Sequence, residues 1–299
     1  VEEYLNDTGR WDGKDRIRAL ADLVPCENPH WRELFYRWFL SMTAHWRGLD
    51  RQHGNSTSPL LVGAQGYRKS TFCRILLPPE LRFGYTDSID FKSKQEAERS
   101  LGRFFLINID EFDQINANQQ GFLKHLLQKP VANLRKPYGT TIQEMRRYAS
   151  FIGTSNLKDL LTDPSGSRRF ICIEVTGPIQ TNVTINYHQL YAQAMHDIMK
   201  GERYWLDDTD EAIVKEYNRE FERVDPLEEL FLCHFRGAEE SEEGEWLTAM
   251  QIFNDLQQKT RDKLAINRIA AFGRTLRKLD ILNKKSNRGT LYHLVRIEE

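Results

Sequence analysis

The chain has 299 residues, 40% of them hydrophobic, so it is long enough to bury a full core. Its 42 basic and 43 acidic residues give a formal net charge of −1, which excludes a global field attracting nucleic acid and leaves only local patches. The four cysteines form no Cys-x-x-Cys pair, which excludes a zinc ribbon. No apolar run approaches the ~20 residues of a membrane span, and no signal peptide opens the chain. We therefore expect a cytoplasmic protein without a membrane partner.

Residues 1–50 have the spacing of a helical segment. After the start signal Asn28-Pro29, one face carries a stripe at helical spacing formed by Trp31, Leu34, Phe35, Trp38 and Phe39. A stripe of large apolar side chains usually belongs to a core, so we expect it to pack against the domain that follows. The polar run 52–59 then interrupts the pattern, as a loop would.

In residues 51–200 the pattern changes to short apolar runs separated by amphipathic stretches. The runs are Leu60–Val62, Phe104–Ile109, Ala149–Ile152 and Phe170–Val175, and helical periodicity lies between them, as at Ser93–Leu101 and Gln119–Leu127. Buried strands that alternate with helices predict an α/β layered domain.

The first apolar run leads into a glycine-containing loop and the start of a helix, with the residues Gly63, Ala64, Gln65, Gly66, Tyr67, Arg68, Lys69, Ser70 and Thr71. A phosphate-binding loop (P-loop) needs backbone N–H groups turned inward around an anion. It also needs a lysine that reaches the β- and γ-phosphates and an adjacent hydroxyl for magnesium. The sequence therefore predicts ATP and Mg²⁺ as cofactors, with Lys69 on the phosphates and Ser70 on the metal.

Arg68 departs from this pattern. The motif G-x-x-x-x-G-K-[ST] has a glycine immediately before the lysine. The arginine could restrict the dihedral angles of the loop or crowd the nucleotide. Alternatively, its guanidinium could point outward or add a charge near the phosphates.

The second apolar run ends in two acidic residues, Asp110 and Glu111. A buried parallel strand delivers such residues to the carboxyl edge of a sheet, where ligands bind. We expect Asp110 to hold magnesium, directly or through water, and Glu111 to orient and deprotonate the attacking water. An ordinary acidic turn is the alternative, and the upstream loop disfavours it.

Two further polar elements accompany the later runs. The strand at 149–152 continues to Asn156, whose amide can bind the attacking water or the γ-phosphate, and which can also cap a helix at Leu157–Leu161. Arg168 and Arg169 precede the last run. One of them can act as a finger on a neighbouring subunit's nucleotide, with a surface salt bridge as the alternative.

A basic and aromatic segment lies between the acidic pair and the third strand end. Pro137 and Gly139 predict a hairpin tip that carries Arg135, Lys136 and Tyr138. Cations for phosphates and a ring for base stacking suit a strand of nucleic acid, although a solvated hairpin fits the same pattern.

Charge separates in the last third of the chain. Residues 207–245 hold 15 acidic and 4 basic side chains, whereas residues 246–299 hold 11 basic and 5 acidic ones. We interpret 201–245 as a helical and acidic linker, and 246–299 as a winged-helix-like domain in which helices from Trp246 onward precede a basic hairpin. The expected DNA-binding residues are Arg274, Arg277, Lys278, Lys284, Lys285 and Arg288. A module for protein contacts is the alternative.

Taken in order, the motifs resemble the virulence-associated protein E family: Gly-x-x-Gly-x-x-Lys-Ser, hydrophobic-Asp-Glu, the basic hairpin, Gly-Thr-Ser-Asn and Gly-Ser-Arg-Arg-Phe. The resemblance covers about residues 1–200, including the lead-in from Tyr4 to Ile17. It implies an AAA+-like P-loop ATPase akin to superfamily-3 helicases, which replicates a mobile element or phage and is often attached to a primase. It also implies a homo-oligomeric ring, for example a hexamer, whose hairpins grip single-stranded or forked DNA. The residues that carry over are Lys69, Ser70, Asp110, Glu111, Asn156 and one of Arg168 and Arg169.

Three functions are weighed on this basis. The first is an ATP-driven motor on DNA. The second is a nucleotide-gated DNA-binding factor that hydrolyses little or no ATP and recruits replication or transposition partners; Arg68 favours it, and the pair Asp110 and Glu111 opposes it. The third is a small-molecule kinase, which the Arg-Arg-Phe element and the separate basic tail oppose.

Overall fold

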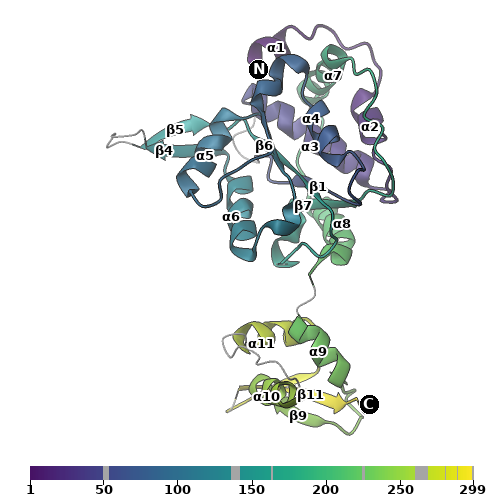
Figure 1. The fold of residues 1–299 in the computed structure, drawn as a ribbon, viewed down its shortest axis with the longest axis vertical. Coiled ribbons are helices and arrows are strands. Elements are labelled where there is room, and N and C mark those ends of the chain that lie inside the picture. Colours follow the sequence, from purple (N-terminus) through teal and green to yellow (C-terminus); the bar gives the residue numbers. More distant parts are fainter. Residues whose placement is uncertain are drawn as a thin grey trace. The chain divides into compact units, whose positions relative to one another are not determined.

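The computed structural model describes residues 1–49, 54–135, 142–162, 164–223, 226–259, 269–279, 281–287 and 289–297. The chain divides into two compact units, Val1–Arg223 and Val224–Glu299 (Figure 1). The first unit contains two clusters of buried apolar side chains and the second contains one. Within the described residues, no helix combines the length and the apolar character that crossing a bilayer would require.

The first unit is built on a parallel sheet of five strands. The sheet order is β2-β3-β6-β1-β7, and each neighbouring pair is parallel. The strands are β1 (Ser58–Val62), β2 (Tyr85–Thr86), β3 (Leu106–Ile109), β6 (Ser150–Ser155) and β7 (Phe170–Glu174). The α/β architecture predicted from the alternating pattern is therefore present. The short edge strand β2 is the one that the apolar runs did not predict.

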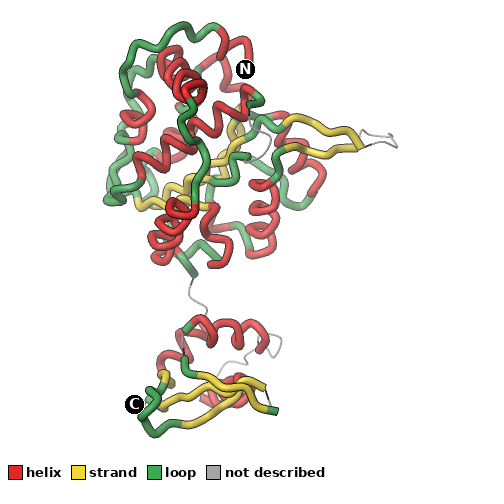
Figure 2. The backbone as a smooth tube through the Cα atoms, turned by 180° about the vertical axis from the view of Figure 1, so that it is seen from behind, coloured by secondary structure: helices red, strands yellow, loops and turns green. Residues whose placement is uncertain are grey.

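Helices cover both faces of this sheet (Figure 2). They are α1 (Glu2–Asn6), α2 (Arg16–Ala21), α3 (Trp31–Arg47), α4 (Lys69–Ile75), α5 (Lys94–Arg103), α6 (Ala117–Gln128), α7 (Tyr187–Lys200) and α8 (Asp208–Asn218). Short 3-10 helices are η1 (Pro79–Gly84), η2 (Phe112–Gln114), η3 (Pro164–Arg169) and η4 (Arg219–Phe221).

Alternating side chains of the central strands enter different cores. On β1, Leu61 packs with α3 and α7, whereas Leu60 and Val62 pack with α5 and α6. A strand with apolar side chains on both faces is typical of a parallel sheet that is covered by helices on each side. The aromatic stripe of α3 belongs to the first core, so residues 1–49 form one unit with the sheet.

A hairpin leaves this unit between α6 and β6. Strands β4 (Val131–Arg135) and β5 (Ile142–Arg146) pair antiparallel and extend away from the sheet in both views (Figures 1 and 2). The predicted hairpin is therefore present. Arg135 ends β4, while Lys136 and Tyr138 lie outside the described residues.

Arg147 lies at the base of this hairpin and hydrogen-bonds the backbone around it. Its side chain is 1% exposed, and its guanidinium donates to five backbone carbonyls, those of Asn55, Leu126, Leu127, Lys129 and Ala149. The last carbonyls of α6 lack the i+4 donor of a continuing helix, and besides the Lys129 amide, which reaches the Leu126 carbonyl, the guanidinium supplies donors to them. The hairpin is thereby tied to α6 and to the start of β6.

The second unit contains three helices and a mostly antiparallel sheet. Its elements are α9 (Pro226–His234), β8 (Phe235–Gly237), β9 (Glu245–Thr248), α10 (Ala249–Lys259), α11 (Ile269–Lys278), β10 (Asn283–Ser286) and β11 (Gly289–Arg296). Strand β11 pairs with β8, β9 and β10. The expected hairpin after the helices is thus formed by β10 and β11.

The division of the chain differs from the boundaries expected at residues 201 and 246. Helix α8 belongs to the first unit, because Asn218 at its end bonds the backbone of Ser167 and Phe170. Helix α9 and strand β8 belong to the second, because β8 pairs with β11 and α9 enters the same core. Trp246 lies in a strand, so the helix expected to open there begins only at Ala249.

Candidate functional site

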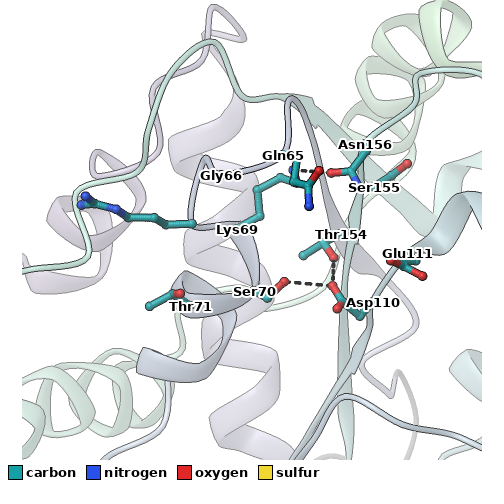
Figure 3. A pocket seen from close by; sticks show the side chains of 11 residues that line it. Gln65, Gly66, Lys69, Ser70, Thr71, Asp110, Glu111, Thr154, Ser155 and Asn156 are labelled. Atoms are coloured by element: carbon teal, nitrogen blue, oxygen red, sulfur yellow. Dashed lines mark hydrogen bonds between the residues drawn. The ribbon is translucent and has the colours of Figure 1, made fainter.

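A cavity of about 380 Å³ lies where β1, β3 and β6 end. It is lined by Gln65, Gly66, Arg68, Lys69, Ser70, Thr71, Asp110, Glu111, Thr154, Ser155 and Asn156 (Figure 3). Three segments separated by more than thirty residues each therefore meet at the carboxyl edge of the sheet. This edge is where open α/β sheets bind their ligands.

The loop 63–68 joins β1 to α4 in a conformation that its glycines permit. A Cβ atom at Gly63 would lie 2.7 Å from the carbonyl oxygen of Val175, so a side chain there would displace the backbone. Gly66 has φ of +87°, which side-chain-bearing residues rarely adopt. The loop is held from outside by the amide of Ile179, which donates to the carbonyl of Tyr67 at 3.0 Å.

Lys69 is buried at the mouth of this loop. Its side chain is 6% exposed, and its ammonium donates to the carbonyls of Gly63 at 2.6 Å and Ala64 at 2.9 Å, and to Oδ1 of Asn156 at 3.0 Å. Burial lowers the pKa of Lys69, and the negative charge of Asp110 partly opposes that shift. The loop and the end of β6 thus hold one cation between them.

Ser70 and Asp110 face each other across the cavity. The Ser70 hydroxyl donates to Oδ1 of Asp110 at 2.9 Å, and the Thr154 hydroxyl donates to the same oxygen (Figure 3). Asp110 follows β3, Thr154 belongs to β6, and Ser70 lies in the first turn of α4. Thr154 was not predicted, because its contact depends on the pairing of Ile109 with Gly153 on the neighbouring strands.

Glu111 and Arg68 have left-handed backbones, with φ of +50° and +61°. Within the described part of the chain they are the two non-glycine residues with positive φ, and both line the cavity. Such conformations cost of order 1–3 kcal/mol and cluster at functional sites. Arg68 therefore adopts the backbone that the expected glycine would adopt more easily, which is how the loop accommodates it.

Asn156 follows directly after β6, with its side chain toward Lys69 (Figure 3). The helix expected at Leu157–Leu161 is absent, since this described segment is irregular. The hydroxyl of Ser155 accepts from the Leu157 amide at 3.1 Å and so makes a local turn instead. The capping role considered for Asn156 is therefore wrong. Its side-chain amide lines the cavity instead.

The two candidate finger arginines lie elsewhere in the fold. Arg168 and Arg169 end η3, and neither lines the cavity of its own chain. The guanidinium of Arg168 pairs with Glu211 of α8 at 2.6 Å, which is the salt bridge considered as the alternative.

The described residues of the second unit that were predicted to bind DNA lie on α11 and β10. Arg274 and Arg277 are exposed, as are Lys284 and Lys285, and the Lys284 ammonium lies 3.7 Å from the centre of the Trp246 ring. Arg288 and the side chain of Lys278 lie outside the described residues. The described cations are thus exposed and spread over two elements, and one of them lies over an aromatic ring.

The side chains around the cavity are of the kinds that bind magnesium and phosphate. A hydroxyl and a carboxylate are oxygen ligands that Mg²⁺ prefers, and Mg²⁺ commonly takes only one or two carboxylates together with waters and substrate phosphates. The described residues contain no cluster of three or more His, Cys, Asp or Glu that could hold a metal by themselves. The neighbouring ammonium of Lys69 suits phosphate oxygens.

Comparison with known proteins divides the chain where the structure does. A model of the virulence-associated protein E-like domain matches residues 5–223. A domain of unknown function from a B. Theta gene description (DUF3874) matches residues 225–294. A search of curated proteins finds no match.

Solved structures of the NrS-1 C-terminal region have a similar fold. One A-form apo structure has a TM-score of 0.50 at 13% identity, and a second apo structure has 0.49 at 14%. Each alignment covers 98% of this chain and 78% of the other. This likeness concerns the fold alone. The match over residues 5–223 is more than half of the chain, and the protein is a member of the virulence-associated protein E-like family.

Proposed function

We propose that this protein is an ATP-hydrolysing, DNA-dependent motor of the kind that replicates a mobile element or phage. The observation that carries the proposal is the convergence of Lys69, Ser70 and Asp110 on one cavity at the carboxyl edge of the sheet. The order of the five parallel strands, with β1 next to β6 and β6 next to β3, brings these residues together. Family membership agrees with a role in replication.

The side chains divide the chemistry of phosphoryl transfer among them. Lys69 would exchange the carbonyls of Gly63 and Ala64 for phosphate oxygens, which bring a stronger, charge-assisted bond. Ser70 and Asp110 would hold Mg²⁺, which neutralises charge on the phosphates when bound. Glu111 would accept the proton of the attacking water, and Asn156, once released by Lys69, would orient that water.

DNA dependence rests on the hairpin of β4 and β5 and on the basic surface of the second unit. A hairpin that extends from the ATPase unit can contact a strand that passes through a ring of subunits. In such a homo-oligomer Arg168 or Arg169, which end η3 outside the cavity of their own chain, would act as a finger on a neighbour's nucleotide. Arg168 would first have to leave Glu211.

A second candidate is a nucleotide-gated DNA-binding factor with little or no hydrolysis. Arg68 favours it, because an arginine with φ of +61° strains the loop at the position where the motif has a glycine. Lys69 is also fully engaged by three oxygens of its own chain before any nucleotide enters.

The test is ATP hydrolysis with and without single-stranded DNA, for the wild type and for Glu111→Gln. The proposal predicts DNA-stimulated turnover that falls by about 100-fold or more in the variant, with nucleotide binding retained. Glu202→Gln, at an exposed glutamate away from the cavity, is the matched control and should behave as wild type. Binding without turnover in the wild type would favour the second candidate.

A further inference from the structure

Asp113 is an acidic residue beside the cavity that does not line it. It lies in η2, three residues after Asp110. Its Oδ1 accepts from the Ser155 hydroxyl at 2.8 Å and from the backbone amide of Asn156 at 3.4 Å. Its Oδ2 accepts from the side-chain amide of Gln114 at 2.8 Å. Burial raises the pKa of this carboxyl, but the bonds from Ser155 and Gln114 outweigh burial and leave it lowered. The side chain is therefore a carboxylate at neutral pH.

The end of β6 is held from both faces of the sheet. Successive residues of a strand point to opposite faces, and Thr154 and Ser155 obey this rule. Thr154 donates to Asp110 on the face of α4, whereas Ser155 donates to Asp113 on the other face. The segment that follows β3 thus supplies one carboxylate to each face.

This second contact fixes the backbone from which Asn156 projects. The backbone amide of Asn156 donates to Asp113. The Ser155 hydroxyl shares its one proton between Oδ1 of Asp113 and the Leu157 carbonyl, both at 2.8 Å, and it accepts from the Leu157 amide. The Asn156 side chain accepts from Lys69 on its other side. When a phosphate takes Lys69 away, Asp113 is the remaining anchor that keeps Asn156 directed at the cavity.

We propose that Asp113 is a positioning residue for Asn156, acting through Ser155 and the backbone of the turn 155–157. This role deepens the proposed function and rests on it, because Asn156 is the group that would orient the attacking water. Asp113 itself does not line the cavity. Its absence should therefore reduce turnover much more than nucleotide affinity, which Asp113 influences only through its charge interaction with Lys69.

The first experiment separates binding from turnover. Asp113→Ala should lower kcat about tenfold, as expected for losing one charge-assisted hydrogen bond that orients a reacting group. The nucleotide Kd should stay within about twofold. Asp113→Asn keeps an oxygen acceptor for Ser155 and should recover most of the rate. Asp159→Ala, at an exposed aspartate three residues beyond Asn156, is the matched control and should match wild type.

A double-mutant cycle tests whether Asp113 acts through Asn156. In an Asn156→Ala background, Asp113→Ala should cause no further loss of kcat, because the group it positions is already gone. Two independent, multiplicative losses would overturn the proposal. Ser155→Ala removes the same contact from the other side, and it serves if Asp113→Ala proves unstable.

A readout without nucleotide separates this inference from the proposed function. Hydrogen exchange of a peptide covering residues 154–160 should be faster in Asp113→Ala than in wild type, and unchanged in Asp159→Ala. Wild-type protein without any turnover would defeat the proposed function and leave this exchange test standing. Unchanged exchange, or an unchanged kcat in a hydrolysing enzyme, would overturn the positioning role of Asp113.

Discussion

Lys69 in the first unit and Lys284 in the second show two ways in which this protein holds a basic side chain. Lys69 is 6% exposed and donates to three oxygens that come from the loop and from the end of β6. Lys284 lies on the exposed strand β10, over the ring of Trp246. Burying an ammonium costs free energy unless convergent acceptors offset it.

This difference in burial and bonding distinguishes a preorganised binding site from a charged surface. At the sheet edge, residues from α4, β3 and β6 are placed by strand register, and their partners are fixed in turn. On β10, Lys284 and Lys285 are exposed to solvent, and Lys284 also contacts the ring of Trp246. Substitutions at the first region should therefore change affinity, rate or stability sharply, and substitutions at the second should act mainly through summed charge.

The largest effect is expected at Arg147, whose guanidinium serves five backbone carbonyls. Arg147→Met would remove a buried donor from all five carbonyls, of which that of Leu126 keeps the Lys129 amide, so we expect a loss of about 3 kcal/mol or more in the free energy of unfolding. Arg274→Met on the exposed face of α11 should cost less than about 0.5 kcal/mol. Urea unfolding, followed by hydrogen exchange in peptides of each unit, measures both. Equal losses of unfolding free energy in the two variants would contradict the difference between the two regions.

A tenfold effect is expected at Ser70. Ser70→Ala removes the hydroxyl that bonds Asp110 and that would bind Mg²⁺, so half-maximal nucleotide binding should need about tenfold more Mg²⁺. Ser100→Ala is the matched control, because that hydroxyl bonds the Glu96 carbonyl within α5. A magnesium titration in which the two variants coincide would argue against a metal site at Ser70.

His45 should make the first unit sensitive to acid. Burial, together with the charges of Arg147 and Arg146, lowers the pKa of His45 to about 3, whereas the unfolded chain has a value near 6.5. The unfolded state therefore binds more protons between these values, and stability falls as the pH drops through that window.

The measurement is the free energy of unfolding between pH 6.5 and 5. The His45 contribution to its slope is at most about 1.4 kcal/mol per pH unit. His45→Gln keeps an acceptor for the backbone amide of Asn55. It should make the unfolding free energy of the first unit, measured in its peptides, depend less on pH, and it should not change the pH dependence measured in peptides of the second unit. Equal slopes for wild type and variant would show that His45 is not the titrating group.

The smallest effect is expected on the basic surface of the second unit. Lys284→Ala combined with Lys285→Ala should weaken DNA binding a few-fold and reduce the slope of log K against log salt by about 1.5, as for two lost phosphate contacts. Hydrolysis without DNA should not change. Lys200→Ala combined with Lys215→Ala, also exposed, is the control pair. An unchanged salt slope would assign this surface to protein contacts instead.

The sequence predicted those parts of the site that local pattern determines. Lys69 and Ser70 follow a strand in a recognisable spacing, and Asp110 ends an apolar run, so neighbouring residues along the chain are enough to identify each of them. Thr154 and Asp113 could not be identified in this way, because their contacts depend on the register between β3 and β6, which pairs residues 44 positions apart. Alternation along β6 shows only that Thr154 and Ser155 face opposite ways.

Long-range pairing also explains the misplaced boundaries. Strand β8 looked like part of an acidic linker, since its partner β11 lies more than fifty residues later. Trp246 looked like a helix start, because a short strand before α10 has no periodicity of its own. Lys136, Tyr138 and Arg288, which the sequence predicts to bind DNA, lie outside the described residues, so their role stays a prediction.

The most direct test of the central claim is calorimetric titration of ATP with Mg²⁺ into wild type and Lys69→Ala. The account predicts saturable binding to the wild type and an affinity lower by about 10- to 100-fold in the variant, since a charge-assisted contact contributes about 1.5–3 kcal/mol. Equal affinities, or no binding by the wild type, would contradict a nucleotide site at the carboxyl edge of the sheet.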